Sequence, residues 1–219
     1  MKIFLDTANR ELIKKFIPTG LVDGVTTNPS LLSKEGSNVK EVLLDICNIV
    51  QGDVSIEVVE KEPQAVFKQA KEIAALADNV VVKIPFAFQY LPVIDRLTKE
   101  GVRLNVTLIF SSLQALLVAK LGVSYISPFI GRLDDIGIRG TEIVQEIMDI
   151  INEYEFESEI IAASIRTVTH LQDVARIGVD VATVPPKILE QIMIHPLTEK
   201  GIELFDNDWK KLGKKNLLE

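Results

Sequence analysis

Short apolar runs alternate with amphipathic segments along the whole chain. The apolar runs are rich in β-branched residues and predict strands, whereas the segments between them carry apolar residues at helical spacing. Eight strands are expected, at about 3–5, 22–27, 54–59, 79–85, 103–109, 125–129, 159–163 and 181–184. A helical segment follows each strand, at about 9–16, 40–50, from 63 onward, and at 91–99, 113–121, 140–151, 168–177 and 187–193.

This alternation predicts an α/β fold with parallel strands and right-handed crossovers. Eight units favour a single closed (β/α)8 barrel, the TIM barrel, over residues 1–219. The alternative is an open doubly wound sheet, which usually has a glycine-rich first turn, and the chain contains no G-x-G-x-x-G motif. Residues 195–219 lie beyond the last unit, and we expect them to form a C-terminal helical extension that covers the barrel base or packs on another subunit. Its apolar residues at amphipathic spacing are Leu197, Ile202, Phe205 and Trp209.

The composition is that of a globular chain, with 47% hydrophobic and 25% charged residues. A net charge of −7 argues against binding to nucleic acid or an anionic membrane, so an anionic substrate requires a local cationic pocket. The single cysteine, Cys47, lies in an apolar helical run, excludes an intramolecular disulfide and fits a reducing compartment. Neither a signal peptide nor an apolar run of membrane-spanning length is present, so we expect a cytoplasmic protein.

A lysine interrupts the most apolar of the predicted strands. Lys83 follows three consecutive valines and precedes Ile84 and Pro85. Burial among apolar side chains disfavours an ammonium ion, and a neutral, positioned amine adds to ketones and aldehydes to form a Schiff base. The alternative is a lysine at a strand end that extends its ammonium group into water. The residues at the other strand ends bear on this choice.

Polar residues occupy the same end of seven successive predicted strands, which is the end where (β/α)8 barrels carry their functional residues. Each has a structural alternative as a helix cap, a turn residue or a hydrogen-bonded core group. Seven polar groups on one rim instead favour a site, because buried polar groups cost stability unless they are paired. These residues are Asp6, Thr27 with Asn28, Glu57, Lys83, Asn105 with Thr107, Ser127, and Ser164 with Arg166.

The carboxylates in this set, Asp6 and Glu57, are able to move protons close to Lys83. The two histidines, His170 and His195, lack metal-ligand spacing, so a zinc-dependent aldolase is not expected and structural roles are favoured for both. No P-loop and no G-x-S-x-G motif is present.

Two arginines, Arg132 and Arg166, follow the sixth and seventh predicted strands, where barrels often bind phosphate. The guanidinium fork matches phosphate oxygens well. For Arg132 the alternative is a surface ion pair with Asp134 or Asp135. Ser164 is expected near the start of the seventh helix, where it would add hydroxyl and helix-terminal donors.

Motifs over nearly the whole chain resemble the transaldolase family. The resemblance implies a Schiff-base transaldolase of the pentose phosphate pathway, which moves a dihydroxyacetone unit from sedoheptulose 7-phosphate or fructose 6-phosphate to erythrose 4-phosphate or glyceraldehyde 3-phosphate. It implies no metal and no organic cofactor. The motifs are LDTAN at 5–9, GVTTNPSLL at 24–32, VKIP at 82–85, NVTLIFS at 105–111, SPFIGRLDD at 127–135 and ASIRT at 163–167, with a closing run at 195–209 similar to the short-chain microbial branch.

The resemblance also implies a role for each site residue. Lys83 would form the Schiff base, Asp6 would be the acid and base of carbon–carbon cleavage, and Glu57 and Thr107 would hold the catalytic water. The substrate-binding set would be Asn28, Asn105 and Ser127 at the dihydroxyacetone hydroxyls, Arg132, Ser164 and Arg166 at the phosphate, and Phe129 in the same site.

The nearest alternative is fructose-6-phosphate aldolase, which releases free dihydroxyacetone. That group has Gln and Tyr at the positions of Glu57 and Phe129, so both positions favour a transaldolase. A catalytically silent sugar-phosphate binder would keep the arginines but lose Lys83 or the carboxylates. Residues 86–90 depart from the more polar turn of relatives and leave acceptor preference open. Members of the short branch form decamers of two pentameric rings, which implies a homo-oligomer in which the C-terminal helix reaches a neighbour.

Overall fold

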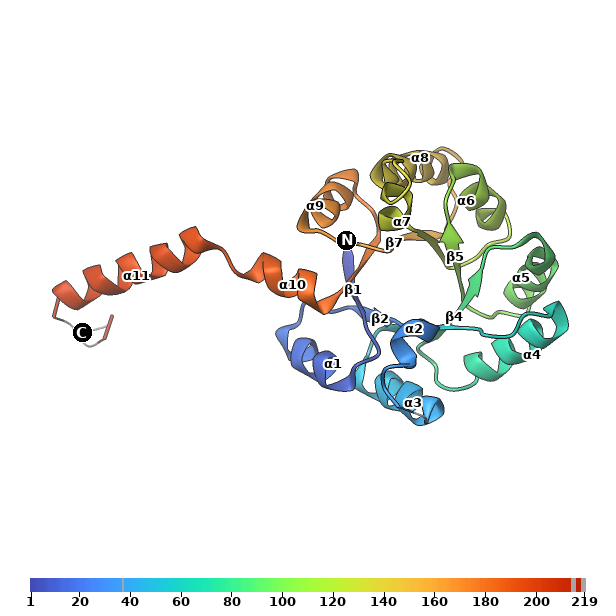
Figure 1. Ribbon diagram of the computed structural model, residues 1–219, viewed down its shortest axis with the longest axis horizontal. Coiled ribbons are helices and arrows are strands. Elements are labelled where there is room, and N and C mark those ends of the chain that lie inside the picture. The colour runs from blue at the N-terminus through green and yellow to red at the C-terminus, as the bar shows by residue number, and fades with distance from the viewer. Residues whose placement is uncertain (37, 214–215, 218–219) are drawn as a thin grey trace.

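The computed structural model describes residues 1–36, 38–213 and 216–217, and its strands form one closed parallel barrel in the order β1 to β8 (Figure 1). β8 pairs with β1, which closes the barrel. The predicted (β/α)8 barrel is therefore confirmed, and the open sheet is wrong. The strands are β1 (Lys2–Asp6), β2 (Gly24–Thr26), β3 (Asp53–Glu57), β4 (Val80–Pro85), β5 (Leu104–Ile109), β6 (Tyr125–Pro128), β7 (Glu159–Ala162) and β8 (Val181–Val184).

Helices surround the barrel as the spacing predicts, and two short helices are additional. The apolar pattern does not predict α2 and α7, because helices of four and five residues are too short to show a helical period. The helices are α1 (Arg10–Phe16), α2 (Pro29–Leu32), α3 (Val39–Ile49), α4 (Pro63–Ala74), α5 (Leu91–Lys99), α6 (Ser112–Ala119), α7 (Ile130–Asp134), α8 (Gly140–Glu153), α9 (Val168–Ile177), α10 (Pro186–Met193) and α11 (Pro196–Lys211), with 3-10 turns η1 (Ile17–Thr19) and η2 (Phe88–Tyr90).

The barrel interior has an apolar layer and, above it, a mostly polar one. The apolar layer is a buried cluster of Phe4, Val81, Tyr125, Ile161 and Val181, separate from the main core between strands and helices. Side chains two positions apart on a strand point to the same side. The residues two positions further along these strands therefore also face the interior, closer to the carboxyl ends, and they are Asp6, Lys83, Ser127, Ala163 and Thr183.

A glycine on β2 makes room for the apolar layer. A Cβ atom on Gly24 would lie 2.6 Å from the ring of Phe4, which is closer than van der Waals contact allows. The same ring packs edge-on against Tyr125, with centroids 6.1 Å apart. These packed rings occupy the interior below the polar layer, and the cavities that the polar side chains line lie toward the carboxyl ends of the strands.

The C-terminal helix α11 projects away from the barrel (Figure 1), and none of its residues is buried. It occupies part of the extension expected at 195–219, of which residues 214, 215, 218 and 219 lie outside the described residues. It does not cover the barrel base. Within the described ranges, no helix has both the length and the apolar character needed to cross a membrane.

Candidate active site

Lys83 lies inside the barrel at the carboxyl half of β4, with only 6% of its side chain exposed. Its Nζ atom is 3.1 Å from Oε2 of Glu57 and donates a 3.3 Å hydrogen bond to the backbone carbonyl of Thr27. The parallel register of β3 and β4 pairs Glu57 with Lys83, which places the two side chains at the same height. A lysine that extends into bulk water is therefore the wrong interpretation of this strand.

Asp6 ends β1 and faces the same interior as Lys83. The hydroxyl of Thr26 donates a 3.1 Å hydrogen bond to its Oδ1 atom. Burial raises the pKa of Asp6, and this effect exceeds the opposing effects of the Lys83 charge and the Thr26 hydrogen bond. The carboxyl group thus takes up a proton more readily than an exposed aspartate does. Asp6 is not a helix cap, because Asn9 caps α1 by accepting a hydrogen bond from the backbone N–H of Leu12.

A buried polar chain crosses β3, β5 and β6. The amide nitrogen of Asn105 donates to the Ser55 hydroxyl at 2.9 Å, and the Ser127 hydroxyl donates to the amide oxygen of Asn105 at 2.7 Å. Thr107, two residues further along β5, is fully buried, and its hydroxyl has no hydrogen-bond partner in the described part of the chain. A buried hydroxyl without a partner is costly, so its environment suits an additional polar molecule.

Two adjoining cavities, of about 210 and 340 Å³, open at the carboxyl ends of the strands. Both are lined by Asn28, Lys83, Phe129 and Arg132. Nine of the eleven predicted site residues line one or both cavities, while Asn105 and Thr107 lie in the wall behind them. The smaller cavity adds Asp6, Ser127, Ser164 and Arg166, and the larger one adds Glu57.

The ring of Phe129 lies close to both Lys83 and Arg132. The Nζ atom of Lys83 is 6.0 Å from the ring centroid, and the Cζ atom of Arg132 is 5.0 Å from it. Phe110 packs edge-on against the same ring at 6.0 Å. Among the described residues Arg132 makes no ion pair, so the suggested pair with Asp134 or Asp135 is not formed, and its guanidinium group remains available at the cavity mouth.

The second arginine, Arg166, is the one that pairs with Asp135, and this pair holds the pKa of the Asp135 carboxyl below its usual range. A glycine lets Arg166 lie across α7, because a Cβ on Gly131 would be 2.7 Å from Nε of Arg166 and 2.5 Å from the backbone oxygen of Ser164. That same oxygen accepts a 3.1 Å hydrogen bond from the N–H of Gly131. Close backbone contact therefore fixes the loop after β7 against α7.

Ser164 lies in this loop rather than at a helix end. Its φ of 59° is left-handed, and α9 begins only at Val168 with Thr167 as its cap. The expected helix-terminal donors at Ser164 are therefore wrong, although its side chain does line the smaller cavity. His170 holds the loop from α9: Nδ1 accepts the N–H of Arg166 at 3.3 Å, and Nε2 lies 2.7 Å from Oδ2 of Asp134.

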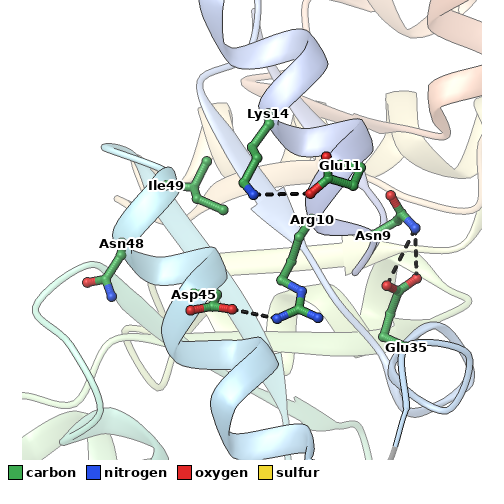
Figure 2. A pocket seen from close by; sticks show the side chains of 8 residues that line it. All are labelled: Asn9, Arg10, Glu11, Lys14, Glu35, Asp45, Asn48 and Ile49. Atoms are coloured by element: carbon green, nitrogen blue, oxygen red, sulfur yellow. Dashed lines mark hydrogen bonds and ion pairs between the residues drawn. The ribbon is translucent and has the colours of Figure 1, made fainter.

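A larger cavity, of about 420 Å³, lies outside the barrel between α1 and α3 (Figure 2). Its charged groups face one another rather than open space. Since both cations that line it, Arg10 and Lys14, already have a carboxylate partner, this cavity offers no unpaired cation to an anionic substrate and is not the candidate active site. The pairs are Arg10 with Asp45 at 2.5 Å, Lys14 with Glu11 at 3.1 Å, and the Asn9 amide with Glu35 at 3.2 Å.

Sequence reasoning missed two threonines that line the smaller cavity, Thr26 and Thr183. Their hydroxyl oxygens are 2.5 Å apart. The signal for Thr183 was the two-residue period in the eighth predicted strand, because Val181 faces the apolar layer and Thr183 is two positions further along. Of the described residues, no three His, Cys, Asp or Glu side chains gather as a metal site.

The closed barrel and its polar mouth define a (β/α)8-barrel protein with its site at the carboxyl ends of the strands. Solved structures of the same fold include a flavocytochrome b2 variant with sulfite bound, at a TM-score of 0.59 and 11% identity over 84% of this chain and 56% of that one. Inosine 5′ monophosphate dehydrogenase from Legionella pneumophila has a TM-score of 0.60 and 11% identity, over 86% and 58%. The chain spans just over half the length of these proteins, and the likeness shows the fold alone.

The sequence model of the Transaldolase/Fructose-6-phosphate aldolase family matches residues 3–216. The chain is 51% identical to a probable transaldolase of Bartonella tribocorum over 98% of this chain and 99% of the relative. Probable transaldolases of Clostridium tetani (50%, over 98% and 100%) and Methanococcus maripaludis (51%, over 96% and 98%) are similar. The chain therefore belongs to the transaldolase/fructose-6-phosphate aldolase family, and the resemblance noted in its motifs is confirmed.

Proposed function

We propose that the protein is a Schiff-base transaldolase of the pentose phosphate pathway that acts in the cytoplasm. It transfers a dihydroxyacetone unit from sedoheptulose 7-phosphate or fructose 6-phosphate to erythrose 4-phosphate or glyceraldehyde 3-phosphate. The observation that carries this proposal is a buried lysine, Lys83, with its Nζ atom 3.1 Å from Glu57 and with Asp6 lining the same cavity. Membership in the family supports the same reaction class.

The covalent step begins when Nζ of Lys83 attacks the ketone carbon of the donor sugar. Glu57 is close enough to take the ammonium proton that must leave before the amine attacks. The carbinolamine then loses its oxygen as water, which leaves a protonated imine. This cation is the electron sink for the next step, because it accepts the electron pair of the bond that breaks.

Cleavage then requires a base at the hydroxyl next to the breaking bond. Asp6 takes the proton of the C4 hydroxyl, the C3–C4 bond breaks, and the aldose phosphate leaves with a new aldehyde group. The electron pair moves into the enamine on Lys83. When an acceptor aldehyde arrives, the enamine carbon attacks it and Asp6 returns its proton to the new alkoxide. The raised pKa of Asp6 suits a residue that must both take and return a proton.

We assign the dihydroxyacetone hydroxyls to Asn28 and Ser127, which line the smaller cavity, with Asn105 fixing Ser127 from behind. The hydrolytic water is assigned to Glu57 and Thr107. The Thr107 hydroxyl, which lacks a hydrogen-bond partner in the described part of the chain, supports this assignment, because a bound water would satisfy it.

The phosphate of the sugars is assigned to Arg132, Arg166 and Ser164. Arg132 lacks a carboxylate partner within the described residues, whereas Arg166 has Asp135. An incoming phosphate therefore binds Arg132 directly and competes with Asp135 for Arg166. Arginine forks and phosphate oxygens form charge-assisted hydrogen bonds, which are stronger than neutral ones.

Fructose-6-phosphate aldolase is the alternative, because the matching family contains both activities. Purified protein is incubated with fructose 6-phosphate and erythrose 4-phosphate, and sedoheptulose 7-phosphate and free dihydroxyacetone are measured separately. A transaldolase gives mainly the seven-carbon product. Dihydroxyacetone released at a similar rate with or without acceptor would establish the aldolase instead, and neither product would refute both.

We also propose that the chain forms a homo-oligomer through α11. This helix is without a buried residue in the single chain, and Leu197, Ile202 and Phe205 are 71%, 63% and 77% exposed. Exposed apolar faces of this kind mark protein contacts. The resemblance implies a decamer of two pentameric rings. Light scattering after chromatography tests this, and Phe205→Asp is expected to yield smaller species, with Asn207→Asp on the same helix as the charge-matched control.

A further inference from the structure

We propose that Thr183, on β8, is a positioning residue that acts through Thr26 to hold Asp6 in its ionised form. This inference rests on the proposed role of Asp6 and deepens it. Thr183 lines the cavity and its hydroxyl oxygen lies 2.5 Å from that of Thr26. Thr26 in turn donates to Oδ1 of Asp6 at 3.1 Å. Three side chains from three neighbouring strands thus form one continuous chain of hydrogen bonds.

The direction of this chain follows from counting hydrogens. A hydroxyl group has one hydrogen to donate. Thr26 uses its own hydrogen in the bond to the Asp6 carboxylate. Its contact with Thr183 can then be a hydrogen bond only if Thr183 donates and Thr26 accepts. The order is therefore from Thr183 to Thr26 to Asp6, and it ends on an acceptor that carries negative charge.

Burial of the two threonines allows this chain of hydrogen bonds to stabilise the Asp6 carboxylate. Thr26 and Thr183 are 2% and 4% exposed, so bulk water does not replace either partner freely. Hydrogen bonds in such a chain polarise one another, and the donation from Thr183 strengthens the donation from Thr26. Removal of the Thr183 hydroxyl weakens the bond to Asp6, because Thr183 acts on that residue through the hydroxyl of Thr26.

Protonation of Asp6 adds a hydrogen to this set, and one hydrogen is then left without a protein acceptor among the described residues. When the carboxyl group carries a proton and donates it to Thr26, the Thr26 hydrogen turns toward Thr183. The hydrogen of Thr183 then has no protein acceptor among the described residues and faces the cavity. Only the ionised form uses all these hydrogens within the protein. The hydroxyl chain therefore opposes the burial that favours protonated Asp6.

The charged groups that surround Asp6 come from other elements and stay in place when Thr183 changes. Lys83 on β4 favours the carboxylate, and Glu57 on β3 is paired with Lys83. Arg132 and Arg166 line the cavity from α7 and from the loop after β7. On α1, which follows β1, Arg10, Glu11 and Lys14 line the cavity outside the barrel, and Lys15 pairs with Glu190 on α10. A change at Thr183 therefore isolates the contribution of the hydroxyl chain.

The test is a pH titration of the Asp6 carboxyl carbon by NMR in protein labelled with carbon-13 aspartate, with the resonance assigned through Asp6→Asn. Thr183→Val keeps the shape and removes the hydroxyl, and it is expected to raise the titration midpoint by about 0.5 to 1 unit, about three- to tenfold in proton affinity. Thr183→Ser keeps the hydroxyl and is expected to restore the wild-type midpoint. In activity measurements, the acidic limb of the pH profile of kcat/KM should move to higher pH together with the titration midpoint.

An unchanged midpoint in folded Thr183→Val overturns the inference. An equal shift in Thr183→Ser also overturns it, because the cause would then be packing rather than the hydroxyl. Thr183→Ala removes the same hydroxyl without a branched side chain and decides the question if Thr183→Val does not fold. If wild-type protein forms no borohydride-trapped adduct with fructose 6-phosphate, the proposed function fails, whereas the NMR titration still decides the order of the hydroxyl chain.

Discussion

The Nζ atom of Lys83 lies 3.1 Å from Oε2 of Glu57, and both side chains are largely withdrawn from solvent, at 6% and 14% exposed. This contact joins the proposed nucleophile to the group that would take its proton. Removal of one partner of a buried ion pair leaves an uncompensated charge and typically costs about 3–5 kcal/mol. Variants at either position are therefore expected to change stability as well as chemistry, and the two effects must be separated.

Lys83→Met should abolish the covalent adduct and lower the melting temperature. In wild type, fructose 6-phosphate and borohydride should add a three-carbon unit that peptide mass spectrometry locates at Lys83. The double variant Lys83→Met with Glu57→Gln should regain part of the stability, because the Glu57 charge is no longer left without its partner, yet it should form no adduct. Lys83→Arg keeps a cation but cannot form an imine, so it should also be inactive.

The exposed Lys120 supplies the matched control, and Lys120→Met should label like wild type. Adduct found at another lysine, or full transfer activity in Lys83→Met, would remove Lys83 from the mechanism.

Asp6→Asn should lower transfer activity and should raise the stability of the protein by an amount that depends on pH. Because burial raises the pKa of Asp6 in the folded protein, its favourable contribution is complete at pH values below the unfolded pKa and is lost as the pH rises through the folded one. Asparagine does not titrate, so the variant should gain stability relative to wild type as the pH rises above the ordinary aspartate pKa of 3.8 and through the higher pKa of folded Asp6. Transfer activity should fall by about 10²–10⁴-fold. Denaturant unfolding of both proteins at several pH values measures the difference in their free energy of unfolding. A difference that stays constant with pH would contradict this prediction.

The period of apolar residues was sufficient to predict the barrel, because each strand and helix has its own spacing and the strands follow one another around the barrel in chain order. The same logic located most of the residues that line the candidate site, since parallel strands bring their carboxyl ends to one rim. It did not reveal which arginine would be paired. Within the described ranges Arg132 has no ion-pair partner, whereas Arg166 pairs with Asp135. Both outcomes depend on α7, a five-residue helix with no readable period.

The conformation of Ser164 also depends on contacts that only the folded chain makes. Its left-handed backbone delays α9 until Val168, and the nearby backbone of Gly131 holds the loop. Likewise, the contact of Thr183 with Thr26 forms only because β8 pairs with β1 and brings the two threonines together. The contact between Thr26 and Thr183 joins residues 157 positions apart, and the local sequence pattern carries no information about it.

Arg132→Ala and Arg166→Ala should weaken recognition of phosphate more than formation of the imine. Loss of one charge-assisted partner costs about 1.5–3 kcal/mol, or about 10- to 150-fold in kcat/KM. The loss should be much smaller for unphosphorylated sugars. The effect of Arg166→Ala should be the lesser of the two, because in the free protein Arg166 is already engaged by Asp135. Values of kcat/KM for each variant with phosphorylated and unphosphorylated donors test both expectations.

Arg176 is exposed at the end of α9, away from both cavities, so Arg176→Ala serves as the control. An equal loss with both kinds of donor would show that these arginines act on something other than phosphate.

The partition between transfer and release should depend on the ring at position 129. In the proposed mechanism dihydroxyacetone stays on Lys83 after cleavage, and the acceptor aldehyde competes with water for it. Phe129 lines both cavities and its ring centre lies 6.0 Å from Nζ of Lys83, so it presents an apolar surface where a water would have to bind. Phe129→Tyr adds a hydroxyl to that surface, which is expected to orient water and raise the release of free dihydroxyacetone.

A tenfold change in this partition needs only about 1.4 kcal/mol between the competing barriers, which one well-placed hydrogen bond supplies. Sedoheptulose 7-phosphate and free dihydroxyacetone are quantified in parallel for wild type and Phe129→Tyr. Phe110 packs edge-on against Phe129 but lines neither cavity, so Phe110→Tyr adds the same hydroxyl outside the site and should leave the ratio unchanged. If Phe129→Tyr folds, forms the imine and still transfers and releases in the wild-type ratio, the apolar ring does not control access of water, and the choice between transfer and hydrolysis must lie with Glu57 and Thr107.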